Sequence, residues 1–269
     1  AWTDYGFMGH PHIETPNLDR LAARSAAFTR GYVPTALCRP ALATFATGLY
    51  AHQHRISGND PSLLPGTAKS GAAGKKAKGG GGGESPEYLA LREKLISQLD
   101  RLPTVPKLLA PLGYLSHQSG KWWEGGYERG GFTHGMTRGF PKPGGRHGDD
   151  GLKIGREGMQ PIFDFIDHSV AEKKPFFIWY APFLPHTPHT PPDRLLAKYK
   201  AKGVKSEYVA KYYAMVEWFD ETCGQLFDRL EAKGLTRNTL VVYVVDNGWI
   251  QSEDAPGFAP RSKQSANEG

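Results

Sequence analysis

The sequence predicts an α/β protein with a central, mostly parallel sheet flanked by helices. Residues 175–180 and 239–245 are near-continuous apolar runs, which are typical of strands buried on both faces of a parallel sheet. Residues 206–233 carry apolar side chains in steps of three and four, which predicts one long helix with a single buried face. Helices that alternate with buried strands belong to the α/β class.

The first helices are predicted from their terminal residues. Thr15 can cap a helix, and Pro16 suits its first turn. A second, short helix is expected to begin at Pro40, just after Cys38, and to end near Gly48.

The middle of the chain supplies one helix, one strand and one insertion. Residues 105–112 are predicted to be helical, and residues 113–118 form a short strand that leads into Lys121. Residues 62–84 contain five consecutive glycines, which lose much backbone entropy on ordering. We therefore expect a single domain over residues 1–269, with 62–84 as a low-complexity, flexible insertion.

Composition narrows the function classes. Hydrophobic residues make up 39% and charged residues 22%, which is ordinary for a globular domain. No apolar run reaches the roughly 20 residues of a membrane-spanning helix, and no signal peptide is visible. The net charge of +6 favours solubility or attraction to an anionic substrate, and no nucleic-acid motif accompanies it.

Polar residues follow three predicted strands at the point where each strand ends. They are Lys121, His186 and the pair Asp246 and Asn247. Ligands of open α/β sheets bind beyond the carboxyl ends of the strands. The sequence therefore predicts an active site where these residues converge.

The candidate residues each admit two interpretations. Asp246 and Asn247 offer hard oxygen ligands for Ca²⁺ or Mg²⁺, but Asp-Asn-Gly is also a turn sequence, and two ligands do not hold a metal alone. Cys38 is placed at a helix start, which suits a reactive thiol or a bound sulfate, although buried structural cysteines are common. Lys121 is either a cation for an anionic substrate or a solvated side chain. Cys223 lies on the apolar face of the long helix and is therefore predicted to be a core residue.

Six short segments then occur in one order along the chain: residues 15–22, 38–48, 120–122, 185–188, 246–248 and 263–269. Together they resemble the formylglycine-dependent sulfatases of the alkaline-phosphatase-like superfamily. The resemblance spans nearly the whole chain, and it implies the alkaline-phosphatase-like fold.

The resemblance implies a set of catalytic roles. Cys38 would be oxidised by the formylglycine-generating enzyme to formylglycine, whose hydrate attacks the sulfur of the substrate. Lys121 and Lys263 would neutralise charge on the sulfate, and His186 would protonate the leaving alcohol or bind sulfate. The implied substrate is a sulfated small molecule or carbohydrate.

The resemblance also implies a metal ion and an incomplete chain. Asp246 and Asn247 would bind Ca²⁺, with Mg²⁺ as a second option. The family uses two further Asp ligands, which are expected upstream of Ala1. We therefore expect the catalytic domain to be truncated at both ends. The resemblance also implies that the protein is exported to the periplasm or the extracellular space.

The sequence departs from the family signature at three positions. Ala41 and Leu42 replace the signature Ser and Arg, and Trp123 replaces a His. Arg39 is one residue after Cys38 and is not expected to substitute for the lost Arg. The vacant histidine role is open to three others in the chain: His54, His134 and His189.

Three functions follow from these observations. The first is a sulfuric ester hydrolase acting on sulfate esters, including those of carbohydrates. The second is a phosphodiesterase or phosphonate hydrolase of the same superfamily. The third, motivated by Ala41, Leu42 and Trp123, is a non-catalytic homologue that binds sulfated glycans.

Overall fold

The computed structural model describes residues 3–61, 85–139 and 148–246, and within them the central element is a parallel sheet. Its strand order is β2-β1-β3, with β1 (Leu115–Gly120) between β2 (His134–Gly135) and β3 (Phe176–Ala181). Both pairings are parallel, and His117 on β1 is in register with His134 and Ile178 on its two neighbours. The predicted class, α/β with a parallel sheet, is confirmed.

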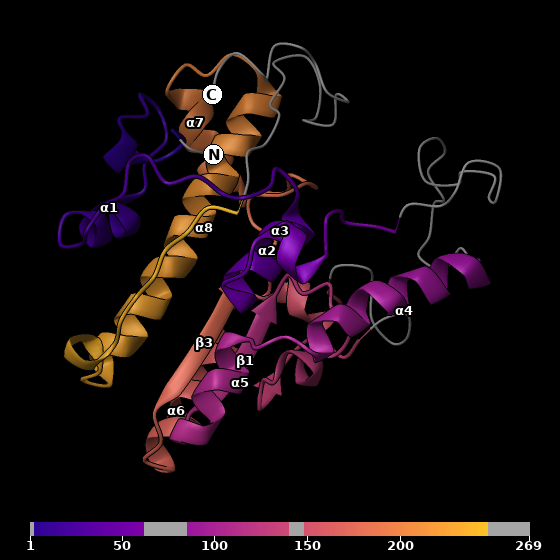
Figure 1. Cartoon of the computed structure of the whole chain (residues 1–269). Coiled ribbons are helices and arrows are strands. Elements are labelled where there is room, and N and C mark those ends of the chain that lie inside the picture. Colours follow the sequence, from indigo (N-terminus) through magenta and orange to yellow (C-terminus); the bar gives the residue numbers. More distant parts are fainter. Residues whose placement is uncertain (1–2, 62–84, 140–147, 247–269) are drawn as a thin grey trace.

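Helices surround this sheet (Figure 1). The helices of the described residues are α1 (Pro16–Ala22), α2 (Cys38–Thr47), α3 (Ala51–His54), α4 (Pro86–Asp100), α5 (Val105–Leu109), α6 (Gln160–Ala171), α7 (Asp193–Ala201) and α8 (Glu207–Ala232). Shorter 3-10 helices are η1 (Gly6–Met8), η2 (Ala110–Leu112), η3 (Tyr127–Gly130), η4 (Asp150–Lys153) and η5 (Thr236–Asn238).

The side chains of β3 alternate between two apolar layers, as the pleat of a strand requires. Phe176 and Ile178 pack against the buried cluster of α6 and α8. Phe177 and Trp179 pack on the other face, against Trp122 and its neighbours near α2 and α4. The sheet is thus covered on both faces.

The predicted helix over residues 206–233 is confirmed as α8. Ser206 caps it, because its hydroxyl accepts a hydrogen bond from the Val209 amide at 3.4 Å. On α8, Tyr212, Val216 and Cys223 are buried in one cluster with residues of the N-terminal segment, so Cys223 is the core residue expected.

The predicted helix at residue 16 is confirmed as α1, but Thr15 does not cap its backbone. The Thr15 hydroxyl instead accepts from the Gly6 amide and donates to Asp19. The capping acceptor comes from α8, where the buried Asp220 carboxylate accepts from the amides of Asn17 and Leu18 at 3.1 and 2.7 Å. A tertiary contact has replaced the local cap.

The helix after Cys38 begins earlier than predicted. Leu37 is the extended residue before it, and Cys38 is its first residue rather than the residue preceding it. Pro40 is tolerated within the first turn because amides there have no partner inside the helix. Gly48 ends α2 with a φ of 71°, as predicted.

Two predictions about strands are wrong. The side chains of β3 are half-buried rather than fully buried, since a cavity opens along the strand. Residues 239–245 form no strand, although their backbone is drawn out beside α8 (Figure 1). Tyr243 and Val245 pack toward α8, while Leu240 and Val242 are 87% and 73% exposed. The alternation of a strand is present, but within the described residues no neighbour pairs with it.

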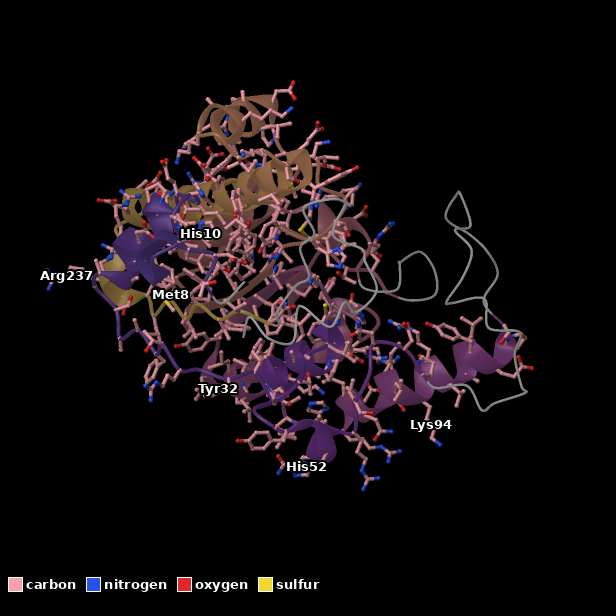
Figure 2. All side chains as sticks on the ribbon, turned by 90° about the horizontal axis from the view of Figure 1, so that it is seen from above. Met8, His10, Tyr32, His52, Lys94 and Arg237 are labelled. Carbon is pink, nitrogen blue, oxygen red and sulfur yellow. The ribbon has the colours of Figure 1, made fainter. Side chains whose placement is uncertain are left out.

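Some expectations lie outside the described residues: the insertion 62–84, Asn247 and Lys263. Within the described part, none of the helices combines the length and apolarity needed to cross a bilayer. Polar and aromatic side chains such as Tyr32, Lys94 and Arg237 project from the periphery (Figure 2).

Candidate active site

Four of the predicted site residues line one cavity. Cys38, Lys121, His186 and Asp246 all contribute to a cavity of about 690 Å³ that also runs along β3. Cys38 comes from the start of α2, Lys121 follows β1, and His186 follows β3. Figure 1 places α2 beyond the carboxyl ends of these strands, which is where an α/β sheet collects its ligands.

Lys121 is the centre of this group. Its Nζ lies 3.7 Å from the Sγ of Cys38 and 3.5 Å from the Oδ2 of Asp246. The lysine is buried, so its charge acts on both groups with little screening by water. The arrangement brings a thiol, a cation and a carboxylate from three distant parts of the sequence together.

The backbone of β1 and β3 fixes Lys121. Its amide donates to the carbonyl of Ala181 at 2.6 Å, and its carbonyl accepts from the Trp179 indole at 3.4 Å. Gly120, directly before it, has a φ of 84°, and a Cβ there would lie 1.8 Å from the Ala181 oxygen. Only glycine therefore permits the close approach that places Lys121.

Cys38 is held as a neutral thiol in this setting. Burial raises the pKa of the thiol above its ordinary value, the Lys121 charge and hydrogen bond lower it, and Asp246 raises it again. The burial effect is the largest, so the helix start does not produce a thiolate. The unmodified thiol is consequently a poor nucleophile at neutral pH.

His186 is oriented by its own loop. Its ring stacks on Phe183 with centroids 4.4 Å apart, and its Nδ1 donates to the Thr187 carbonyl at 2.9 Å. Because a carbonyl only accepts, Nδ1 carries the proton and Nε2 is left with its lone pair. Burial is the main cause that lowers the pKa of His186, with Lys121 acting in the same direction. In the free protein His186 is thus neutral and more suited to accepting a proton than to giving one.

Arg156 anchors the loop that carries His186, and sequence reasoning missed it. Its guanidinium donates to the carbonyls of His186 and Pro188 at 2.8 and 3.2 Å and to the Thr190 hydroxyl at 3.1 Å. The same guanidinium lies 5.7 Å from the Phe183 ring. In the sequence, only the abundance of prolines indicated that the His186 loop is held in one conformation.

The structure shows where the three residues that differ from the family signature lie. Ala41 and Leu42 are buried on α2, and Leu42 contributes an apolar wall to the cavity. Trp123 is buried as well. Arg39 does not reach toward Cys38, because its guanidinium forms two hydrogen bonds of 2.6 Å with Glu124. The expectation that Arg39 does not replace the lost signature Arg is consistent with this contact.

The three spare histidines do not join Cys38. Within the described residues, His186 is the histidine that lines the cavity, whereas His54, His134 and His189 do not. His54 is buried against Thr44 on α2. Which histidine takes the role of the missing family His therefore stays a prediction.

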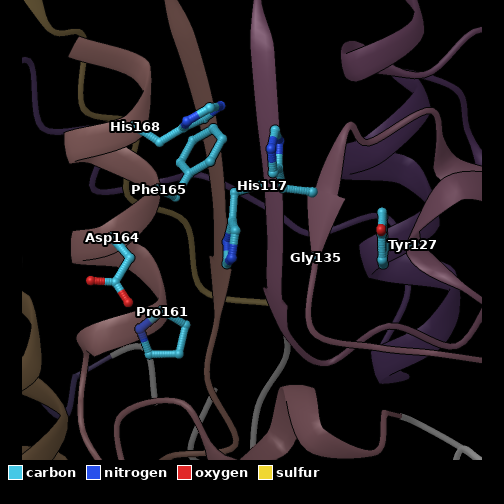
Figure 3. A pocket seen from close by; sticks show the side chains of 8 residues that line it. His117, Tyr127, Gly135, Pro161, Asp164, Phe165 and His168 are labelled. Atoms are coloured by element: carbon cyan, nitrogen blue, oxygen red, sulfur yellow. The ribbon is translucent and has the colours of Figure 1, made fainter. Parts of the chain in front are cut away.

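A second pocket, of about 430 Å³, lies between α6, β1 and β2 (Figure 3). Its lining consists of His117, Tyr127, His134, Gly135, Pro161, Asp164, Phe165 and His168. It contains none of the residues at the strand ends. The predicted site residues that the structure describes therefore lie in the cavity with Cys38 and not in this pocket.

The described residues do not complete a calcium site. Ca²⁺ requires six to eight oxygen ligands, and Asp246 is paired with Lys121 here. No group of three or more His, Cys, Asp or Glu side chains in the described part of the chain is arranged to hold a metal ion.

Comparison with known proteins gives a family match over nearly the whole chain. The family model described as Sulfatase matches residues 1–268. N-acetylgalactosamine-6-sulfatase of Canis lupus familiaris is 25% identical over 92% of this chain and 48% of its own length. Arylsulfatase A of Homo sapiens is 26% identical over 92% of this chain and 50% of its own length. The chain spans about half the length of the curated relatives it matches.

Solved structures confirm the fold. The crystal structure of Ps i-CgsB has a TM-score of 0.66 at 24% identity, covering 96% of this chain and 58% of that chain. Its complex with k-i-k-neocarrahexaose has a TM-score of 0.64 at 24% identity, with the same coverage. The phosphonate monoester hydrolase of Agrobacterium radiobacter has a TM-score of 0.51 at 17% identity, covering 87% of this chain and 57% of that chain. The expected alkaline-phosphatase-like architecture is therefore confirmed.

Proposed function

This chain belongs to the sulfatase family, and on that premise we propose that it forms the catalytic part of an enzyme that hydrolyses sulfate esters. The observation that carries the proposal is the contact of Lys121 with both Cys38 and Asp246 in one cavity. A buried cation next to the nucleophile position is what an anionic sulfate group needs for binding and for stabilisation of its transition state.

Each residue of the cavity has a role in this proposal. The Lys121 ammonium neutralises charge on the sulfate oxygens. Cys38, once oxidised to formylglycine, supplies the nucleophilic hydroxyl that the neutral thiol does not provide. His186 accepts a proton through Nε2, and a bound anion next to it would raise its pKa so that it can return the proton to the leaving alcohol.

We propose sulfated carbohydrates as the substrate class. The relatives named N-acetylgalactosamine-6-sulfatase act on a sulfated sugar by name, and the Ps i-CgsB complex contains an oligosaccharide. An apolar wall that includes Leu42, Phe45 and Leu184 lines the cavity beside the polar group. Such a wall suits the carbon face of a sugar ring better than a second charged group.

Further parts of the proposal come from the family alone. Asp246 and Asn247 would contribute oxygen ligands to Ca²⁺, with Lys263 as a second cation on the sulfate. A formylglycine-generating enzyme would be the partner that converts Cys38, and the protein would be exported.

The test is sulfate release by the full-length protein, produced together with the formylglycine-generating enzyme and supplied with Ca²⁺. Aryl sulfates, sugar sulfates and phosphate diesters are compared as substrates. We expect sulfate esters to be turned over faster than phosphate diesters, and Cys38→Ala to abolish turnover. Faster turnover of phosphate diesters would favour the phosphodiesterase alternative.

The non-catalytic alternative has a separate readout. Ala41 and Leu42 in place of the signature residues favour it, because recognition by the modifying enzyme depends on that signature. Mass spectrometry of the Cys38 peptide distinguishes the two: an aldehyde supports the enzyme. An unmodified thiol, together with binding of a sulfated glycan without turnover, would support the binding protein.

A further inference from the structure

We propose that the buried ion pair between Arg39 and Glu124 is a positioning device that holds Cys38 against Lys121. Neither residue touches the expected substrate position through the contacts described, so both act through their neighbours. The inference rests on the proposed function for its catalytic consequence, whereas the placement of Cys38 can be measured without any turnover.

The geometry of the pair is well defined. The Nε and Nη2 of Arg39 donate to the two carboxylate oxygens of Glu124, each at 2.6 Å. The two side chains are 0% and 3% exposed. A bidentate contact fixes both distance and orientation, and burial prevents water from replacing either partner.

The sequence positions of the pair make it a link between the two halves of the site. Arg39 directly follows Cys38 at the start of α2. Glu124 is three residues after Lys121, in the segment that leaves β1. The pair therefore joins the segment that carries the thiol to the segment that carries the ammonium, next to the 3.7 Å contact between Cys38 and Lys121.

The start of α2 needs such a link. Its preceding residue, Leu37, offers no side-chain cap. The far end of the helix is anchored by Ala46, which packs in the apolar cluster of Trp122. At the near end, the Arg39 amide donates to the Asn59 side chain at 2.9 Å, and the Arg39 guanidinium supplies the ion pair. Without the pair, the near end of α2 would keep the Asn59 contact but lose the side-chain contact that joins it to the segment after Lys121.

A second buried arginine reinforces the arrangement. Arg92 on α4 donates to the Trp123 carbonyl at 3.0 Å, directly before Glu124. Burial and the charge of Arg39 lower the pKa of Arg92, and Glu124 acts against this. Glu124 therefore lies between two buried arginines, and Arg92 has a second acidic partner in Asp60, whose Oδ1 lies 3.6 Å from its Nη1.

The experiment separates positioning from simple stability. Removing one partner alone leaves a buried charge without its counterion and threatens folding, whereas an apolar pair of similar volume is usually tolerated. We therefore choose the double variant Arg39→Met/Glu124→Leu in the full-length protein, with Glu124→Asp as a second variant that keeps the charge and shortens the reach. The matched control is Arg194→Met/Glu221→Leu, which removes an exposed bidentate pair of 2.6 and 2.5 Å between α7 and α8.

Three quantities are measured: the thermal midpoint, kcat and KM for a sulfate ester, and the rate of Cys38 alkylation by iodoacetamide at fixed pH. Alkylation is followed by mass spectrometry on protein made without the formylglycine-generating enzyme. We expect the double variant and Glu124→Asp to remain folded, with kcat reduced about 100-fold, KM nearly unchanged and an alkylation rate that differs several-fold from that of the wild type. The control should change none of the three.

The outcomes are distinguishable from failure of the proposed function. If the wild type turns over no sulfate ester, the alkylation rate alone decides, because it depends on the burial of Cys38 and on its distance from Lys121, and both change if the start of α2 moves. Wild-type kcat, or a wild-type alkylation rate where there is no turnover, in either folded variant would overturn the positioning role. Should the double variant unfold, Glu124→Asp gives the same two readouts.

Discussion

Lowering the pH below 6.5 is expected to destabilise the fold through His117. This histidine is 5% exposed on β1, and it lines the pocket of Figure 3. Burial is the main cause that lowers its pKa to about 4, and the charge of His134 acts in the same direction. Between pH 6.5 and about 4 the unfolded chain therefore binds a proton that the folded chain does not.

The sign and size of the effect follow from that difference. The stability due to neutral His117 is fully present above pH 6.5 and is lost as the pH falls toward 4. At about 1.4 kcal/mol for each unit of pKa difference, the loss amounts to roughly 3 kcal/mol. His134, whose pKa burial also lowers, adds to the loss in the same pH range.

The assay is urea unfolding of the full-length protein at about pH 7.0, 5.5 and 4.5. The first value lies above the pKa of an unfolded histidine, and the other two lie between that pKa and the lowered pKa of His117. The variant His117→Gln should flatten the pH dependence, and His52→Gln, at an exposed site on α3, should leave it as in the wild type. If His117→Gln loses as much stability as the wild type between these pH values, burial of neutral His117 is not the cause.

The remaining predictions concern the site and its supports. Gly120→Ala should lower the thermal midpoint strongly or prevent folding, because a Cβ would lie 1.8 Å from the Ala181 oxygen; a midpoint like that of the wild type would contradict the close approach. Lys121→Met should lower kcat for sulfate release by about 10²-fold or more while the protein stays folded, and retention of kcat would remove the lysine from the proposed chemistry. Asp220→Ala should reduce the free energy of unfolding by about 3 kcal/mol in urea titrations, because it removes the acceptor for two amides of α1. Asp220→Asn keeps one acceptor oxygen, so its free energy of unfolding should fall by less.

Much of this architecture is encoded locally. The spacing of Tyr212, Val216 and Cys223 predicted α8, because a helix face repeats every three to four residues. The sequence also predicted that Lys121 and Asp246 lie near each other, and both line one cavity, although Asp246 follows an extended run rather than a paired strand.

What the sequence did not indicate depends on contacts between distant segments. The cap of α1 comes from Asp220, about two hundred residues away, and the partner of Arg39 comes from beyond β1. Neither contact leaves a spacing or a composition that can be read locally. The two-residue strand β2 is likewise too short to show a period.

The extended run beside α8 has a practical consequence for handling this chain. Residues 239–245 consist of a threonine followed by leucine, valines and tyrosine, with no charge and no proline, and Leu240, Val242 and Val244 face solvent. Segments of this composition associate edge to edge through their unpaired amides and carbonyls. The 269-residue chain produced by itself should therefore aggregate increasingly as its concentration rises. The variant Val242→Lys, which places a charge on the exposed side of the run, should keep the protein dispersed.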